Sequence, residues 1–384
     1  MKKGEVINGY TILQDFTTSG GGSCKWTFAK KNSTEYFIKE FLFPTYPVEG
    51  SPGSPKTIAE KRKQCEAFER HHQSIIDALK GKCAEGSNLV VARDFFRWGP
   101  KYYKVTDKID VSSLQINDIA RLTFDKRIII LKTVAHSLRI LHQAGIVHSD
   151  LKPDNILIKQ TLAGYYTTKL IDFDSSYFSG NPPTITEEVV GDMVYYSPEL
   201  GLYVQGDRSV KPTDLQLSSD IFALGLIYCQ YLTGSLPDFD KKKYRYPYVA
   251  ILNGESLRIN ILSDKLKSLL DSMLSKEAAK RPNIDEVFSK LKELKDTDLP
   301  TPSPDSLSRD KGAGKSTSSS LLRGHLVNKE TGTPKKFKDT DLPTPSPDSL
   351  SREGAGESTS SSLRGHLVNK ETGTPKIKRE LSKK

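Results

Sequence analysis

The sequence predicts an α+β fold with two lobes, a small β-rich lobe at the N-terminus and a larger helical lobe after it. Residues 8–41 alternate apolar and polar side chains around a glycine cluster, which is the pattern of half-buried strands. Beyond Ser218 the apolar residues recur at helical spacing instead. This change of period separates the expected sheet from most of the expected helices.

The N-terminal part can be assigned in chain order. We expect three strands within 8–41, a Pro/Gly/Ser loop at 50–55, a helix over 56–80, and two strands over 89–96 and 101–105. The helix is predicted because Ile75, Ile76 and Leu79 gather on one side. A turn at 98–100 joins the last two strands.

The C-terminal part opens with a strong amphipathic helix over 124–144, which Gly145 ends. Segments 156–158 and 169–171 are short apolar runs on either side of an Ala-Gly turn. They predict a hairpin.

Composition limits the possible partners. The chain has 384 residues and a net charge of +10, spread along its length and not gathered into a stripe, so nucleic-acid binding is not expected. The longest apolar run, near 221–232, is too short to span a membrane. Residues 1–6 lack a signal-peptide core, and the four cysteines show no metal-binding spacing. These features predict a cytoplasmic protein with free thiols and no membrane span.

The character of the chain changes near Lys295. Residues 296–308 recur at 339–351, and the segments are rich in Ser, Thr, Pro and Gly. Such a segment cannot bury a core, so we expect a disordered tail over 296–384. The predicted domains are therefore a folded one over 8–293 (lobes of about 8–106 and 110–293) and a tail with two near-identical repeats, 296–338 and 339–379.

The most informative stretch is 148–155, which reads His-Ser-Asp-Leu-Lys-Pro-Asp-Asn after an apolar run. Asp150 can accept a proton, Lys152 can neutralise a phosphate, and Asn155 offers an oxygen to a hard metal ion. Phosphoryl transfer depends mostly on positioning and charge neutralisation, so this set suits that chemistry.

This stretch resembles the catalytic loop, HRDLKxxN, of the eukaryotic-like protein kinases. Further motifs of that family follow in order along the chain. They are a strand lysine (Lys39), a DFG-like triplet (172–174), an APE-like triplet (197–199), a buried helix aspartate (Asp220) and a late arginine (Arg281) expected to pair with the APE glutamate, Glu199. The resemblance covers about residues 8–293. The lysine at 152, followed by Pro-x-Asn, is similar to the Ser/Thr type.

The resemblance implies an enzyme, an ATP- and Mg²⁺-dependent serine/threonine protein kinase that phosphorylates protein substrates and itself. Asp150 would orient the acceptor hydroxyl, and Lys152 would offset charge on the transferred phosphate. Lys39 would hold the α- and β-phosphates. Asn155 and Asp172 would be the metal ligands.

The resemblance also implies a nucleotide site. Glycines let backbone amides approach phosphates, so the run Gly20, Gly21 and Gly22 before Lys39 is expected to cover them. Lys39 needs a carboxylate to position it. We prefer Glu69 on the 56–80 helix, with Glu66 as the alternative.

Between the lobes, Thr106 falls at the gatekeeper position. Asp107 and Ile109 would then offer backbone groups to adenine. This assignment depends on the strand alignment.

Four residues depart from the family pattern. Ser149 replaces the arginine that binds an activation-segment phosphate, so dependence on such a phosphate is not expected. Asp174 replaces the glycine of DFG, which makes that turn harder to flip. Phe37 replaces a small residue, and its ring would crowd adenine or stack on it. Asp192 stands where a threonine is usual, and its pairing with Lys152 is open.

Two other functions compete with the kinase reading. A pseudokinase or scaffold would use the tail to recruit partners, but it would need neither Lys39 nor Asp150. A small-molecule kinase usually lacks the APE-like segment and its arginine. The tail, with Ser/Thr-Pro sites at 301–304 and 344–347, is expected to be a substrate segment that phosphopeptide-binding partners recognise.

Overall fold

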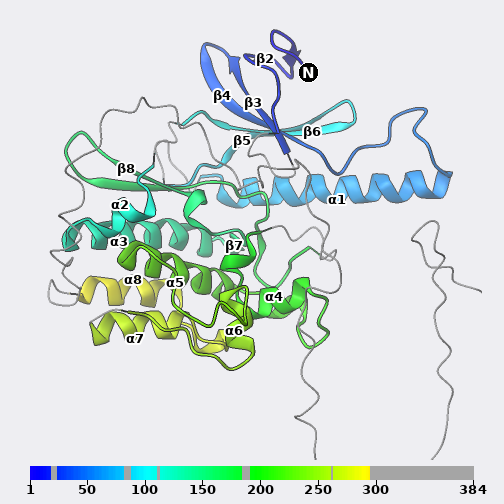
Figure 1. Ribbon diagram of the computed structural model, residues 1–384. Coiled ribbons are helices and arrows are strands. Elements are labelled where there is room, and N and C mark those ends of the chain that lie inside the picture. Colours follow the sequence, from blue (N-terminus) through cyan, green and yellow to red (C-terminus); the bar gives the residue numbers. More distant parts are fainter. Residues whose placement is uncertain (19–23, 82–87, 110–112, 184–190, 261–262, 295–384) are drawn as a thin grey trace, which may run out of the picture. The chain divides into compact units, whose positions relative to one another are not determined.

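The computed structural model describes residues 1–18, 24–81, 88–109, 113–183, 191–260 and 263–294 (Figure 1). By its internal contacts the chain divides into two units, Met1–Leu326 and Val327–Lys384, and every described residue belongs to the first. The predicted glycine loop at 20–22 and the repeated tail lie outside the described residues.

The N-terminal part is a six-stranded antiparallel sheet with strand order β1-β2-β3-β4-β6-β5. Its strands are β1 (Val6–Ile7), β2 (Tyr10–Ile12), β3 (Cys24–Lys31), β4 (Thr34–Phe41), β5 (Ala92–Trp98) and β6 (Lys101–Asp107). The three strands expected within 8–41 are confirmed as β2, β3 and β4. The β4–β6 register places Lys39 opposite Lys104 and Phe37 opposite Thr106. Directly opposed residues share one face of a sheet, so these four side chains point the same way.

Helix α1 (Pro55–Leu79) confirms the predicted helix, and it contacts both β5 and β10 (Tyr177–Phe178). The Ser54 hydroxyl caps it by accepting from the Thr57 N–H, and Pro55 fits the first helical turn. Its buried residues are Cys65, His72, Ile75 and Leu79. They follow helical spacing and define the face turned toward the rest of the protein.

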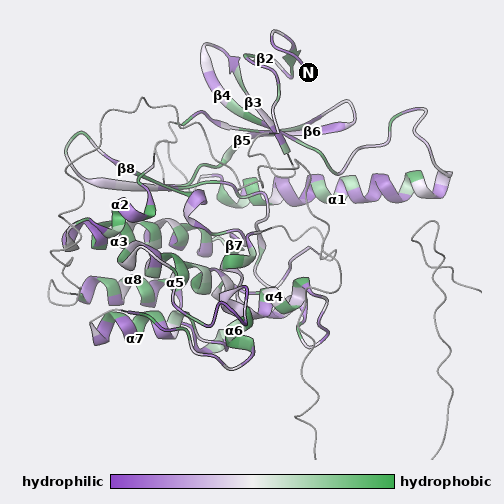
Figure 2. Ribbon diagram, viewed as in Figure 1, coloured by the Kyte–Doolittle hydropathy of each residue, from purple (hydrophilic) through white to green (hydrophobic). Residues whose placement is uncertain are grey.

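The C-terminal part is helical, and the α+β prediction is confirmed. Its helices are α2 (Ile116–Ala120), α3 (Phe124–His142), α4 (Pro198–Val204), α5 (Ser218–Thr233), α6 (Pro247–Leu252), α7 (Asp264–Met273) and α8 (Ile284–Glu293). Helix α3 packs against α5 and α8, and α5 packs against α7 (Figure 1). Helix α5 is green over much of its length in Figure 2, and it is almost wholly buried. Within the described residues, no helix is long and apolar enough to cross a bilayer.

Two short antiparallel pairs of strands lie beside these helices and carry the predicted catalytic residues at their ends. The predicted hairpin is confirmed as β8 (Ile156–Gln160) and β9 (Tyr166–Leu170). Strand β7 (Ile146–Val147) pairs with β10. Gly145, at φ 71°, ends α3 and turns the chain into β7. The two pairs place residues 148–155 and 171–176 next to each other.

Candidate active site

The loop after β7 is held by one buried carboxylate on α5. Asp220 accepts the backbone N–H groups of His148 at 2.8 Å and Ser149 at 3.1 Å. The His142 ring nitrogen Nε2 lies 3.0 Å from the same carboxylate. Ser149 has a φ of 71°, a backbone conformation that costs free energy in a residue other than glycine. The hydrogen bonds to Asp220 hold this strained turn in place.

Asp150, Lys152 and Asn155 are brought together as the sequence predicts. Lys152 Nζ donates to Asp150 Oδ2 at 2.7 Å, and Asn155 Nδ2 donates to the same oxygen at 3.0 Å. Asn155 Nδ2 also donates to the Asp150 carbonyl at 2.7 Å. Proline at 153 begins the short 3-10 helix Pro153–Asn155, which places Asn155 back over Asp150. The carboxylate of Asp150 is therefore fixed in orientation.

Asp192 closes the other side of Asp150 through its backbone. Its N–H donates to Asp150 Oδ1 at 3.0 Å, while its own carboxylate accepts from the Val194 N–H at 3.0 Å. The second bond caps the 3-10 helix Met193–Tyr195. The sequence left open whether Asp192 pairs with Lys152. In the structure Lys152 pairs with Asp150, and the Asp192 carboxylate caps the short helix.

Asp172 and Asn155 lie close together because the backbone joins their segments. The Ile171 N–H donates to the Asn155 carbonyl at 3.0 Å. The His148 ring lies 3.2 Å from the Ile171 carbonyl and 5.2 Å, between centroids, from the ring of Phe173. Asp172 has a φ of 66° and is partly exposed.

These two residues fit a magnesium ion. Both offer side-chain oxygens, which are the ligands that Mg²⁺ prefers. Among the described residues, no group of three or more His, Cys, Asp or Glu side chains gathers for a metal. A metal held by only two protein ligands suits Mg²⁺, because it keeps water molecules and substrate phosphates in its shell.

Lys39 on β4 lies between two carboxylates. Its Nζ donates to Asp172 Oδ1 at 2.6 Å and to Asp174 Oδ2 at 2.8 Å. Burial alone would lower the pKa of Lys39, but Asp172 and Asp174 outweigh it and raise that pKa. Lys39 is therefore charged in the folded protein.

Asp174 has a second partner, Lys104 on β6. Lys104 Nζ donates to Asp174 Oδ1 at 2.5 Å. Burial would raise the pKa of Asp174, but Lys104 and Lys39 hold it well below its usual range. Sequence reasoning noticed the Asp at 174 only as a stiffer turn and missed Lys104. The available signal was a lysine flanked by Tyr102, Tyr103 and Val105, because a lysine buried among such residues needs a partner.

The helix glutamates are engaged elsewhere, which differs from the expected pairing with Lys39. Glu69 Oε1 accepts the hydroxyl of Tyr102 at 2.7 Å and lies 3.8 Å from Arg97 Nε. Glu66 lies 4.0 Å from Arg70 on the same helix. Glu66 is exposed, whereas Glu69 lies one turn from both Cys65 and His72 on the same side of α1 and meets Tyr102 of β6 there in place of Lys39.

The sheet face around Lys39 is aromatic. Phe37 stacks on Trp26 with ring centroids 5.5 Å apart and meets Phe28 edge-on at 6.0 Å. Thr106, the expected gatekeeper, is half-buried directly opposite Phe37. Any base bound beside Thr106 would therefore meet aromatic rings where the family has small residues.

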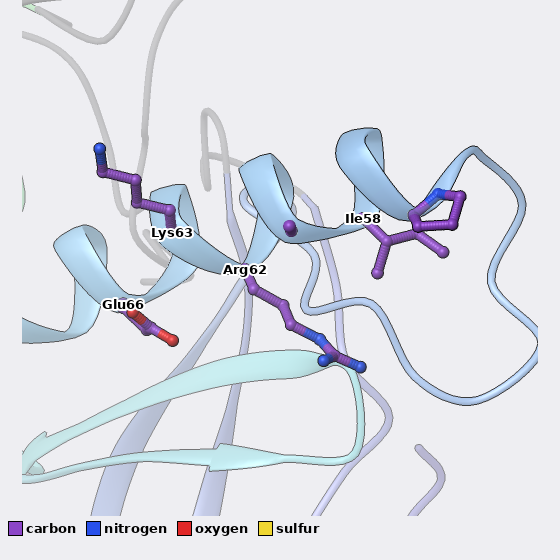
Figure 3. Close-up of a pocket in the computed structure, with 6 residues that line it drawn as sticks. Ile58, Arg62, Lys63 and Glu66 are labelled. Carbon is purple, nitrogen blue, oxygen red and sulfur yellow. The ribbon is translucent and has the colours of Figure 1, made fainter.

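Asp107 and Ile109 follow Thr106 at the end of β6. The Asp107 carboxylate accepts two hydrogen bonds from Arg93, at 2.8 and 2.7 Å, and this pair fixes the end of the strand. Both residues line a cavity of about 430 Å³ beside the end of α1. A larger groove, of about 500 Å³, lies over the first turns of α1 (Figure 3). Its lining includes Arg62, Lys63 and Glu66 but not Lys39 or Asp150.

The predicted pair of Glu199 and Arg281 is confirmed. Arg281 donates to both carboxylate oxygens at 2.7 Å, and the Ser219 hydroxyl donates to Oε1 at 2.8 Å. Burial would raise the pKa of Glu199, but Arg281 lowers it. This buried bidentate pair ties the segment after Asp192 to the helices beneath it.

Known protein kinases resemble part of this chain. The probable serine/threonine-protein kinase PknB of Lactococcus lactis is 30% identical over 153 residues, 39% of this chain and 22% of that protein. The serine/threonine-protein kinase AfsK of Streptomyces coelicolor is 33% identical over 151 residues, 39% and 17%. The ovarian-specific serine/threonine-protein kinase Lok of Drosophila melanogaster is 29% identical over 210 residues, 52% and 39%. The aligned part is less than half of each relative's own length.

A family model described as the protein kinase domain matches residues 55–291, more than half of the chain. This match spans α1, the loop with Asp150, the turn with Asp172 and the Glu199–Arg281 pair. Strands β1 to β4, with Lys39, precede it. From this match and the site geometry, the chain belongs to the protein kinase family.

Proposed function

We propose that the protein is an ATP- and magnesium-dependent serine/threonine protein kinase that phosphorylates protein hydroxyls, including its own. The observation that carries the proposal is the arrangement around Asp150. Its carboxylate is held in one orientation by Lys152, Asn155 and the Asp192 N–H. The similar proteins of Lactococcus lactis and Streptomyces coelicolor are named as serine/threonine-protein kinases, which supports the same activity.

In this proposal Asp150 orients the acceptor hydroxyl and takes its proton as the hydroxyl oxygen bonds to the γ-phosphorus. The bond between that phosphorus and the β-phosphate oxygen breaks, and ADP leaves. Lys152, already 2.7 Å from Asp150, offsets the negative charge on the transferred group.

Lys39 binds the α- and β-phosphates in this proposal. Magnesium held by Asp172 and Asn155 would neutralise phosphate charge. Because Lys39 now donates to Asp172, phosphate binding would exchange one anionic partner of the lysine for another. Such an exchange keeps the lysine charged throughout.

The remaining nucleotide contacts are also proposals. Gly20, Gly21 and Gly22 would cover the phosphates, and Thr106, Asp107 and Ile109 would line the base. The placement of Thr106 opposite Phe37 supports a base site on this face. Base stacking on aromatic rings is favourable and tolerant of geometry.

The direct test is incubation of the purified chain with γ-labelled ATP and magnesium, alone and with a Ser/Thr-rich protein. We expect label on serine and threonine, located by mass spectrometry, and at least about 10²-fold less label with Asp150→Ala. Wild-type protein that binds ATP without transferring phosphate would contradict the proposal and favour the scaffold function.

We also propose that the segment over 296–384 is a substrate of the domain over 8–293 and that its phosphorylated Ser/Thr-Pro sites recruit phosphopeptide-binding partners. Tethering gives such sites an effective concentration of roughly millimolar. The free, buried thiols of Cys24, Cys65 and Cys229 support action in the reducing cytoplasm. Phosphosite mapping of active full-length protein tests the substrate proposal, which fails if these sites carry no phosphate.

A further inference from the structure

Two lysines of neighbouring strands share one carboxylate beneath the sheet. Lys39 and Lys104 are directly opposite in the β4–β6 register, and both donate to Asp174, one to each oxygen. The side chains of Asp174 and Lys104 are 18% and 8% exposed. Like charges directly opposite on two strands repel, so this arrangement needs a negative charge between them.

Asp174 is better placed to meet this need than Asp172. Asp172 contacts Lys39 through one oxygen and is about one-third exposed. Asp174 contacts both lysines and is more buried. A buried lysine that loses its partner carries a large desolvation cost. Asp174 is thus held in place by Lys104 when Lys39 changes partner.

Helix α1 presents no acid to this cluster among its buried residues. The α1 side chains that interact electrostatically with Lys104 are His71 and His72. Burial first, and then Lys104, lowers the pKa of His72 to about 3. His72 is therefore neutral near pH 7. Glu69, which lies one helical turn before His72, accepts a hydrogen bond from Tyr102 and is close to Arg97. Moving Glu69 to Lys39 would break the bond to Tyr102.

We infer that Asp174 is the positioning residue for Lys39 and performs the task that the family resemblance assigns to a glutamate of α1. Lys104 anchors Asp174 so that its position does not depend on a movement of α1. The inference rests on the proposed function, because the task of Lys39 is to hold nucleotide phosphates.

The test compares two carboxylate substitutions of the same kind, Asp174→Asn and Glu69→Gln, with Asp238→Asn as an exposed control. Asp238 pairs with Arg258 at the surface. We expect Asp174→Asn to lower kcat/KM for ATP by about 10²-fold, because displacement of a positioned group by about 1 Å has such an effect. Glu69→Gln should lose much less than Asp174→Asn. The reverse order would overturn the inference.

Asp174→Gly adds a sharper comparison, since glycine is the usual residue of the family at this place. If the aspartate only stiffens the turn, the glycine variant keeps or gains activity, and the inference fails. If Asp174 positions Lys39, the glycine variant is as impaired as Asp174→Asn. Asp174→Glu should recover part of the loss because it restores the carboxylate.

A stability measurement separates positioning from folding. In Lys104→Met, the Asp174 carboxylate keeps one lysine partner, Lys39. In Asp174→Asn, both Lys39 and Lys104 lose the Asp174 carboxylate. The double variant Asp174→Asn/Lys104→Met removes one charge of each sign. We expect the melting temperature of the nucleotide-free double variant to exceed that of Asp174→Asn, while kcat/KM stays low and the magnesium-ATP-induced thermal shift stays reduced. Recovery of activity together with stability would show a purely structural role and overturn the inference.

The same experiments distinguish this inference from the proposed function. Wild-type protein that transfers no phosphate contradicts the kinase proposal by itself. Two of the measurements need no turnover. They are the melting-temperature coupling between positions 174 and 104 in the nucleotide-free protein and the thermal shift induced by magnesium-ATP. A shift that is unchanged in Asp174→Asn would contradict the positioning role even if the kinase proposal holds.

Discussion

The loop around Asp150 and the cluster around Lys39 hold their charges in different ways. Lys152 and Asn155 lie within five residues of Asp150, so a short local motif contains two of the three partners of its carboxylate, and only the Asp192 N–H is distant in sequence. Lys39 meets both of its carboxylate partners in the turn after β9, and one of them, Asp174, is held in addition by Lys104 of β6, so the cluster joins segments far apart in sequence. A local motif carries its contacts with it, whereas a cluster assembled from separate strands depends on register. The contacts of the Asp150 loop are therefore easier to predict from the sequence than those of the Lys39 cluster.

Asp150→Ala should have the largest effect and tests the local side of this comparison. We expect phosphoryl transfer to fall by about 10²–10⁴-fold, as for loss of a general base, with little change in ATP affinity. Single-turnover rates and equilibrium nucleotide binding measure the two quantities. Asp154→Ala is the matched control, because Asp154 is exposed in the 3-10 helix that follows Asp150. Retention of most activity in Asp150→Ala would refute the assignment.

Lys39→Met and Asp172→Ala test the assembled side. Each removes one charge facing the expected phosphates, and we expect turnover to fall by about 10²–10³-fold. Magnesium should increase the thermal stabilisation of wild-type protein by ATP, and Asp172→Ala should weaken that increase. Lys30→Met, at an exposed position of β3, is the control for the lysine. If magnesium makes no difference to wild-type protein, the metal assignment fails.

The same contrast explains how much the sequence could predict. Apolar period and turn residues located α1, α3 and the β8–β9 hairpin, and the motifs located Asp150, Asp172 and the Glu199–Arg281 pair. These depend on patterns within one element or on a known order of motifs. The partner of Lys39 depends on how α1 packs against the sheet, because Glu69 lies on the buried side of α1 and still meets Tyr102 in place of Lys39.

The role of Lys104 illustrates the same limit. It faces Asp174 only because β4 and β6 pair in one register, and a slip by one residue would turn it to the other face. Spacing along the chain does not determine that register. A lysine flanked by Tyr102, Tyr103 and Val105 was nevertheless a sign that a buried acid had to exist nearby.

A pH titration of stability sharpens the comparison further, through His72. Its pKa is lowered to about 3 by burial first and then by Lys104, with smaller contributions from Lys39 and His71 that Asp174 opposes. The unfolded chain binds a proton near pH 6.5 but the folded one does not, so stability is complete above that pH and is lost as pH falls toward 3.

We therefore expect His72→Phe to flatten the pH dependence of the unfolding free energy between pH 6.5 and 4. The slope should fall by up to about 1.4 kcal/mol per pH unit. Phenylalanine suits the site, because His72 already packs against Phe41, Phe68 and Phe95. Urea unfolding at several pH values measures the slope, and the exposed His136→Phe should keep that of the wild type. Equal slopes for His72→Phe and wild type would show that His72 titrates normally.

The smallest expected effect concerns the activation segment, and it follows from Ser149 in the Asp150 loop. In the family an arginine at position 149 binds a phosphate on that segment, but Ser149 is buried here and its N–H donates to Asp220. With no guanidinium at this place, a phosphate has no such partner to order the segment. Alanine at Thr184 and Thr186, which lie outside the described residues, should therefore change the turnover rate only modestly. The turnover of a fully dephosphorylated wild-type sample should likewise stay close to that of the phosphorylated one. A loss of several orders of magnitude in either experiment would show that another basic group binds the phosphate, and the Asp150 loop would then depend on a further distant partner besides Asp192 and Asp220.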